Sequence, residues 1–280
     1  MKLFPLIADN WKLDGGVAFG MVPKTIWSRN HTSDENNAID ITTRCLLIVY
    51  NERKILVDVG LGDKRNEKYY NVRYRQPGVN ILKSLTGIGY SADDITDVLF
   101  THLHDDHVGA ATRFNESGLI ECVFQNAQYW VSGSQWNWAM NPNKRETAAF
   151  FKDNLEPLQE SGRLHLLEKG MQPFDHITLQ VYNGHTHGQI IPFINTGNRT
   201  VVYMGDFIPT VSNIPIPYVP PADIEPLVSM QEKEEFLKAA VENNYILIFV
   251  HDAGNECCTV KQSEKGVVAD HSFILHDIEI

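Results

Sequence analysis

The chain has 280 residues, of which 43% are apolar and 21% are charged, a composition typical of a globular protein. Its formal net charge of −11 weighs against a nucleic-acid substrate, because the surface repels phosphate backbones. No apolar run approaches the roughly 20 residues that span a bilayer, and the first residues lack the apolar core of a signal peptide. We therefore expect a cytoplasmic protein without a membrane partner. Four cysteines are too few for a disulfide framework, and we expect them to be buried as small apolar side chains.

The first half of the chain reads as alternating strands and short helices. We expect strands over residues 2–13, 41–50, 54–59 and 95–100, the second and third forming a hairpin. Residues 17–27 are apolar but are interrupted by Gly20 and Pro23, so we expect a loop there. A helix is expected over residues 107–114, and two short strands over 119–124 and 127–131.

Helices follow over residues 134–140 and 144–159, the second with an apolar face at Ala148, Phe151, Leu155 and Leu158. The second half predicts strands over 163–167, 177–182, 190–195, 200–204 and 245–250, a proline-rich irregular stretch over 211–226, and a helix over 229–243. Strands and helices occur in both halves without a low-complexity linker, which favours two stacked sheets flanked by helices. We expect a single domain over residues 1–280.

One short stretch, Thr101 to Gly109, carries a dense set of potential metal ligands. It contains His102, His104, Asp106 and His107 directly after the predicted strand 95–100. Imidazole and carboxylate suit first-row divalent ions, zinc foremost. His102 and His104 are two residues apart and point to one side of an extended backbone, so they can chelate one ion. Asp106 and His107 are adjacent, so they diverge and fit a second ion.

Three further candidate ligands follow predicted strands later in the chain, namely His185, Asp206 and His251. Loops at strand ends can converge at one edge of a scaffold. A carboxylate has two oxygens, so Asp206 can bridge two ions about 3.5–4 Å apart. Two alternatives remain open: His187 could replace His185, and Asp105 could replace Asp106. We favour His185 and Asp106.

Asp58 ends the apolar strand 54–59 and is followed closely by Gly60. A buried carboxylate at such a place needs partners. Holding the later loop or one of its ligand histidines is a task that fits Asp58.

The motifs match a known family. His102-x-His104-x-Asp106-His107, Gly184-His185-Thr186, Gly205-Asp206, His251 and Asp58-x-Gly60 resemble the metallo-β-lactamase superfamily over roughly residues 10 to 255. A closer likeness lies in Asp14-Gly15-Gly16, Phe19 to Lys24, Trp27, Gly205 to Thr210 and His251-Asp252-Ala253. These stretches resemble the quorum-quenching branch that hydrolyses N-acyl-homoserine lactones, with the methyl parathion hydrolases as close neighbours.

This resemblance implies an α+β protein with the four-layer αββα sandwich and two divalent metal ions, zinc first, with manganese, iron or cobalt as alternatives. It implies that one metal takes His102, His104 and His185, that the other takes Asp106, His107 and His251, and that Asp206 bridges. His104 stands where flavodiiron-type oxidoreductases have Glu, and no cysteine lies near Asp206 as in the commonest zinc β-lactamases. The chain departs from the lactonases at His187, Gln189 and Pro209, the last of which replaces a Tyr that helps the carbonyl in some of them.

The expected function is a dinuclear-metal hydrolase that opens lactones by attack of a metal-activated hydroxide on the carbonyl, with Asp106 passing a proton to the leaving alkoxide. The candidates for an acyl-chain pocket are apolar: Phe19, Met21, Trp27, Trp136, Trp138 and Phe207. A phosphoesterase or organophosphate hydrolase is the alternative reaction, and a non-catalytic metal-binding protein is the alternative class. The expected partner is a small-molecule substrate, and a homodimer is left open.

Overall fold

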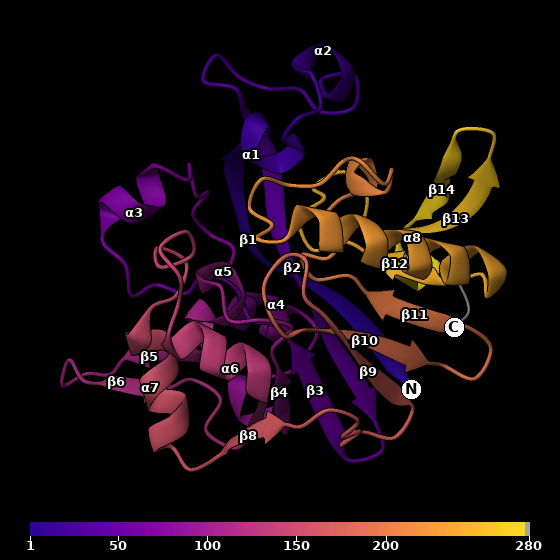
Figure 1. Ribbon diagram of the computed structural model, residues 1–280. Coiled ribbons are helices and arrows are strands. Elements are labelled where there is room, and N and C mark those ends of the chain that lie inside the picture. The colour runs from indigo at the N-terminus through magenta and orange to yellow at the C-terminus, as the bar shows by residue number, and fades with distance from the viewer. Residues whose placement is uncertain (278–280) are drawn as a thin grey trace. The chain divides into compact units, whose positions relative to one another are not determined.

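The computed structural model describes residues 1–277 of the chain (Figure 1). These residues group into two compact units, the first formed by residues 1–10 and 43–171, the second by residues 11–42 and those from 172 onward. Each unit is built on a sheet with helices, which confirms the α+β class. The expectation of a single domain stays a prediction.

The sheet of the first unit has the strand order β1-β2-β3-β4-β7-β8. Its strands are β1 (Lys2–Asp14), β2 (Ala38–Tyr50), β3 (Arg53–Val57), β4 (Asp97–Leu99), β7 (Gln128–Ser132) and β8 (Leu164–Leu167). Residues 11–14 of β1 and 38–42 of β2 are assigned to the second unit. β3 and β4 are parallel, with Val57 opposite Leu99. Asp58 and the loop from Phe100 therefore leave the sheet at the same edge.

Short helices and a small hairpin complete the first unit. The helices are α3 (Glu67–Asn71), α4 (Ile81–Gly87), α5 (Asp105–Val108), α6 (Gly133–Met140) and α7 (Lys152–Glu160), with 3₁₀ turns η1 (Ala92–Asp94) and η2 (Gly109–Ala111). The hairpin pairs β5 (Thr112–Phe114) with β6 (Ile120–Cys122). Leu56 and Val98 of the sheet share one buried apolar cluster with Leu155 and Leu158 of α7, which confirms the apolar face expected at these two positions.

The sheet of the second unit has the order β14-β13-β12-β11-β10-β9. Its strands are β9 (Ile177–Tyr182), β10 (Gln189–Asn195), β11 (Thr200–Tyr203), β12 (Ile246–Ile248), β13 (Cys257–Ser263) and β14 (Gly266–Phe273). β11 and β12 are parallel, whereas β10 runs antiparallel to both β9 and β11. The end of β11, the end of β12 and the β9–β10 loop therefore lie at one edge.

Helix α8 (Pro226–Glu242) packs on this second sheet through Phe236, Leu237 and Ala240, which share a buried cluster with Val202 and Leu247. The remaining elements of the second unit are short: α1 (Gly15–Phe19), α2 (Lys24–Trp27), η3 (Val211–Asn213) and η4 (Leu275–Asp277). β13 and β14 were not expected from the sequence.

The expectation of a loop over residues 17–27 is wrong, because two single-turn helices form there. The carboxylate of Asp14 accepts a hydrogen bond from the Gly16 N–H (2.7 Å) and so caps the start of α1. Gly20 ends α1 with φ of 58°, and Pro23 directly precedes α2. Glycine and proline interrupt the stretch at the ends of the two helices and leave their interiors intact.

The helices expected over residues 107–114 and 144–159 are both shorter than predicted. α5 ends at Val108, and Thr112 then pairs with Cys122 in the hairpin. α7 begins only at Lys152. The side-chain oxygen of Asn143 accepts hydrogen bonds from the Arg145 and Glu146 N–H groups, which gives a local turn in place of the first helical turns.

The four cysteines, all within residues 1–277, are buried and form no disulfide, as expected. Within residues 1–277, no helix combines the length and the apolar character needed to cross a membrane.

Candidate metal centre

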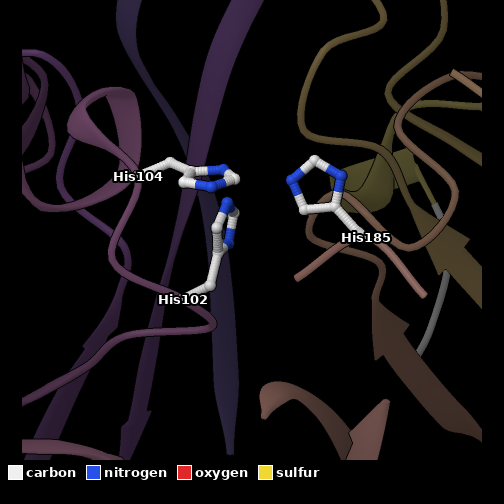
Figure 2. Close-up of side chains that lie close together, drawn as sticks. All are labelled: His102, His104 and His185. Atoms are coloured by element: carbon white, nitrogen blue, oxygen red, sulfur yellow. The ribbon is translucent and has the colours of Figure 1, made fainter. Parts of the chain in front are cut away.

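Three imidazoles of the first unit crowd together in the loop after β4 and the first turn of α5. The rings of His102 and His104 lie 4.6 Å apart at 83° (Figure 2), and those of His102 and His107 lie 4.0 Å apart. Potential ligand atoms of His102 and His104 are within 4.8 Å of each other, and all three side chains are buried. The predicted pairing of His102 with His104 is thus present in the loop.

The two neighbouring aspartates at the start of α5 have different surroundings. Asp106 places Oδ2 3.5 Å from Nε2 of His107. Asp105 accepts a hydrogen bond from the hydroxyl of Tyr69, which lies in α3. It also forms an ion pair at 3.2 Å with Arg73, which follows α3. Burial and the charge of Asp106 raise the pKa of Asp105 to about 6, although Arg73 and Tyr69 act against that shift. Asp105 is thus engaged by Tyr69 and Arg73, whereas Asp106 faces His107, and the choice of Asp106 as the ligand stays a prediction.

Asp58 holds both His107 and the preceding residue Thr101. Its Oδ2 lies 2.8 Å from Nδ1 of His107 and accepts the Thr101 hydroxyl, while its Oδ1 accepts the Thr101 N–H. The Thr101 hydroxyl also lies 3.0 Å from Nδ1 of His102. These contacts fix the ring orientations of both histidines, so that each could bind a metal through Nε2.

Glu146 holds His104, and sequence reasoning missed it. Its Oε1 lies 3.2 Å from Nε2 of His104, while its Oε2 accepts hydrogen bonds from the Trp138 indole N–H (2.7 Å) and the Asn143 amide (2.8 Å). Only 4% of Glu146 is exposed. With Nε2 facing Glu146, His104 could bind a metal through Nδ1. A single glutamate in a stretch expected to be helical gave no signal of this role.

In the second unit, one carboxylate faces two histidines. Oδ2 of Asp206 lies 3.4 Å from Nε2 of His185, and Oδ1 of Asp206 lies 3.1 Å from Nε2 of His251. Both histidines are buried. Each carboxylate oxygen thus faces a different imidazole, the geometry expected of a bridging carboxylate. The preference for His185 over His187 as the ligand stays a prediction.

Nδ1 of each of these two histidines, on the ring side away from Asp206, also has a hydrogen-bond partner. Nδ1 of His185 lies 2.9 Å from Asp223, whose other oxygen accepts the Ser229 hydroxyl at 2.5 Å. Nδ1 of His251 lies 2.7 Å from the carbonyl oxygen of Thr42, so this nitrogen carries the proton. Asp223 was not predicted, because it lies in a proline-rich stretch without a motif.

The loop that carries His185 is fixed on helix α8. The carboxylate of Glu232 accepts hydrogen bonds from the N–H groups of Asn183 (2.8 Å) and Gly184 (3.0 Å). A Cβ atom on Gly184 would lie 2.5 Å from Cα of Ser229, so only glycine allows this close approach. The position of His185 is therefore set by the fold of the second unit.

The chemistry of this donor set fits divalent metal ions. Within each unit, histidines could bind a metal through a defined ring nitrogen, which is Nε2 in His102, His107, His185 and His251 and Nδ1 in His104. The first unit adds the carboxylate of Asp106, and the second unit adds that of Asp206. Histidines oriented by a carboxylate, hydroxyl or carbonyl on the far nitrogen are typical of metal ligands.

Two comparisons decide the family. Residues 40–118 match the family model described as the metallo-beta-lactamase superfamily. The fold also aligns with the crystal structure of a probable metal-dependent hydrolase from Staphylococcus aureus at a TM-score of 0.88 and 30% identity, covering 98% of this chain and 96% of that one. The chain belongs to the metallo-beta-lactamase superfamily. The fold expected from the sequence is thereby confirmed.

Other members of the superfamily are similar at lower identity. The N-acyl homoserine lactonase of Bacillus cereus is 24% identical over 131 residues, which cover 37% of this chain and 52% of the lactonase. The chain thus spans about half the length of the curated relatives it matches. AidC, a dizinc quorum-quenching lactonase solved with the product N-hexanoyl-L-homoserine, shares the fold at a TM-score of 0.77 and 23% identity, covering 97% of this chain and 95% of AidC.

The apolar substrate-pocket candidates of the second unit pack in different places. Phe19 and Trp27 are buried and stack on each other at 5.4 Å, whereas Met21 is 98% exposed. Phe207 stacks on Tyr182 at 4.1 Å inside the cluster beneath α8. The structure therefore does not gather these four candidates into one wall.

The two tryptophan candidates belong to the first unit. Trp136 is buried in its core, and Trp138 is half-buried with its indole N–H on Glu146. Through Glu146, Trp138 supports His104. A role of the six aromatic and methionine side chains in substrate binding stays a prediction.

Proposed function

We propose that this superfamily member is a dinuclear metal hydrolase that opens lactones of the N-acyl-homoserine type. The observation that carries the proposal is the position of Asp206, whose two oxygens face His185 and His251 at 3.4 and 3.1 Å. A carboxylate placed between two ligand imidazoles is suited to bridging two ions.

The ligand assignment follows the family resemblance. One ion would be held by His102, His104 and His185, the other by Asp106, His107 and His251, with Asp206 between them. Support comes from the contacts at one ring nitrogen of each histidine, because a carboxylate, hydroxyl or carbonyl partner there orients the ring as in typical metal ligands.

Zinc is the first choice of metal, because imidazole-rich sites with carboxylates suit it. Such a pair, when bound, lowers the pKa of a water molecule and polarises a carbonyl oxygen. Asp106 and Asp206 offset only two of the four charges of a divalent pair, so the site favours an oxyanion. We assign to the Asp106 carboxylate the proton that must reach the leaving alkoxide when the ring opens.

The choice of a lactone over other esters rests on the relatives. Curated relatives with sequence similarity to this chain are N-acyl homoserine lactonases, and AidC, which shares its fold, is a quorum-quenching lactonase. Because identities lie near one quarter and the matched segments cover about half of each curated relative, we assign the substrate class to this chain as a proposal.

An assay with two substrates tests the proposal. The full chain, loaded with zinc, would be given N-hexanoyl-homoserine lactone and an aryl phosphotriester, with ring opening followed by the acid released. We expect turnover of the lactone and its loss in Asp206→Asn. Robust turnover of the phosphotriester without lactone opening would instead establish the organophosphate alternative.

A further inference from the structure

A polar cavity of about 350 Å³ lies in the second unit, beside the loops that carry Asp206 and His251. Its walls are formed by residues 30–31, residue 40, residues 211–212 and residues 252–255. A volume of this size accommodates part of a small-molecule ligand. Neither the candidate metal ligands nor the six candidates for an acyl-chain pocket are among the residues that line it.

The cavity belongs to the same edge of the sheet as the two ligand loops. Residues 252–255 begin directly after His251, and residues 211–212 follow Asp206 by five residues. The carboxylate of Asp252 ties the two segments together, because it accepts hydrogen bonds from the N–H groups of Val211 (3.0 Å), Gly254 (2.9 Å) and Asn255 (2.7 Å). A chemical group bound in the cavity would therefore contact the loops that carry Asp206 and His251.

Neutral hydrogen-bonding groups line this cavity. Nε2 of His31 lies 2.9 Å from the Ser212 hydroxyl, and the Asn30 amide lies 3.4 Å from the same oxygen. His31 is fixed by its ring contact with Phe19 at 4.9 Å, and Phe19 in turn stacks on Trp27. Burial lowers the pKa of His31, although the charge of Asp252 acts against the shift, so its ring is neutral at pH 7.

The two carboxylates at this cavity are already compensated. Asp252 is surrounded by backbone N–H donors, and Asp40 pairs with Lys12 at 3.4 Å. The cavity therefore offers an imidazole, a hydroxyl and side-chain amides and has no strong preference for a charged group. A secondary amide, with one N–H donor and one carbonyl acceptor, complements such a lining.

We propose that Asn30, His31 and Ser212 form a subsite for the amide group that an acylated lactone carries beside its ring. The assignment rests on the proposed lactonase function. In this arrangement the subsite binds the amide by hydrogen bonds while the ring carbonyl is held among the metal ligands. The chain would then discriminate between lactones with and without an amide through this cavity.

The test compares two lactones that differ in the amide. Steady-state kinetics of the zinc-loaded full chain would be measured with N-hexanoyl-homoserine lactone and with γ-caprolactone, which has no amide. For Ser212→Ala we expect KM for the amide-bearing lactone to rise roughly 5- to 10-fold, as for loss of one hydrogen bond, with kcat within about twofold. Kinetics with γ-caprolactone should be unchanged. Ser212→Thr, which keeps the hydroxyl, should restore the wild-type KM.

The matched control is His271→Leu, which changes an exposed histidine of the same unit whose side chain is 81% exposed and which lies in β14. His31→Leu should behave as Ser212→Ala, and zinc content and circular dichroism would verify that each variant is folded and loaded. Equal changes for both lactones, or none for either, would overturn the subsite. Equal loss of kcat in Ser212→Ala would point to a nucleophilic serine instead. A wild-type chain that opens neither lactone would refute the proposed function itself, and the subsite with it.

Discussion

Oδ2 of Asp58 lies 2.8 Å from Nδ1 of His107, both side chains being fully buried. The carboxylate follows β3 and the imidazole follows the loop after β4, so the parallel pairing of these strands brings them together. Asp58 also adopts a left-handed backbone conformation, with φ of 56°, which asparagine tolerates as well. Replacement by asparagine is therefore a change in hydrogen-bonding chemistry with little backbone strain.

We predict that Asp58→Asn weakens metal binding while leaving the protein folded. An amide N–H₂ cannot accept the hydrogen bonds that Oδ2 receives from Thr101 and His107. Loss of such an orienting contact typically costs 10- to 100-fold in metal affinity. Competition with a chromogenic zinc chelator measures this loss. An affinity equal to that of the wild type would show that Asp58 does not act through His107.

Glu146→Gln tests the corresponding contact on His104. The carboxylate accepts hydrogen bonds on both oxygens, and an amide cannot satisfy all of those donors. We expect about a tenfold loss of zinc affinity for the ion that His104 would hold. We also expect a changed visible spectrum of the cobalt-substituted protein. Glu160→Gln, an exposed position on α7, is the control. Identical spectra for wild type and Glu146→Gln would exclude Glu146 as a positioning residue.

Asp206→Asn should reduce the zinc content from about two ions per chain to one or fewer. The amide retains one neutral oxygen and loses the negative charge that lies between His185 and His251. The measurement is metal analysis after gel filtration, with thermal unfolding as a check on the fold. Retention of two tightly held ions would contradict the bridging role.

Lys233 gives the stability of the second unit a pH dependence. Its ammonium group lies 2.9, 3.4 and 3.2 Å from the carbonyl oxygens of Pro215, Ile216 and Tyr218. Burial lowers its pKa from 10.5 to about 7, although Asp223 acts against the shift. Between these two values the unfolded chain binds more protons than the folded one. The free energy of unfolding therefore rises with pH in this window, by at most about 1.4 kcal/mol per pH unit.

Lys233→Met removes this dependence. Urea unfolding of both proteins at pH 7.5 and 9.0, with metal removed, measures it. We expect the stability of the wild type relative to Lys233→Met to increase by about 1–2 kcal/mol over this range. Subtracting the variant removes the contributions of the other titrating groups. A constant difference, or one that shrinks as the pH rises, would show that Lys233 is charged in the folded chain at both pH values.

Local spacing explains how much of the site the sequence could predict. His102 and His104 alternate along an extended loop, and Asp106 and His107 follow within three residues, so their grouping needs no knowledge of the fold. Glu146 lies 42 residues from His104 in the chain, and only the turn at Asn143 brings it there. That turn replaces the helix that the apolar pattern predicted. Residues that orient a ligand across such distances leave no periodic signal.

In the fold, too, elements with a local sequence pattern were predictable and elements without one were not. The α+β class and the strands before each ligand were predictable, because runs of apolar β-branched residues mark buried strands. The single-turn helix α1 was missed, because it depends on one capping residue, Asp14, and is too short to carry a periodic pattern. The strands β13 and β14 were also missed, because polar residues fill much of both.

Ring opening of N-hexanoyl-homoserine lactone by the zinc-loaded chain tests the central claim most directly. The rate of acid release would be measured for the wild type and for Asp206→Asn at matched protein concentration. The proposed dinuclear lactonase predicts catalytic turnover by the wild type and roughly a hundredfold loss in the variant, because loss of the bridging carboxylate weakens the metal pair that would activate water. No turnover by a wild-type chain that holds two zinc ions, or full turnover by Asp206→Asn, would contradict it.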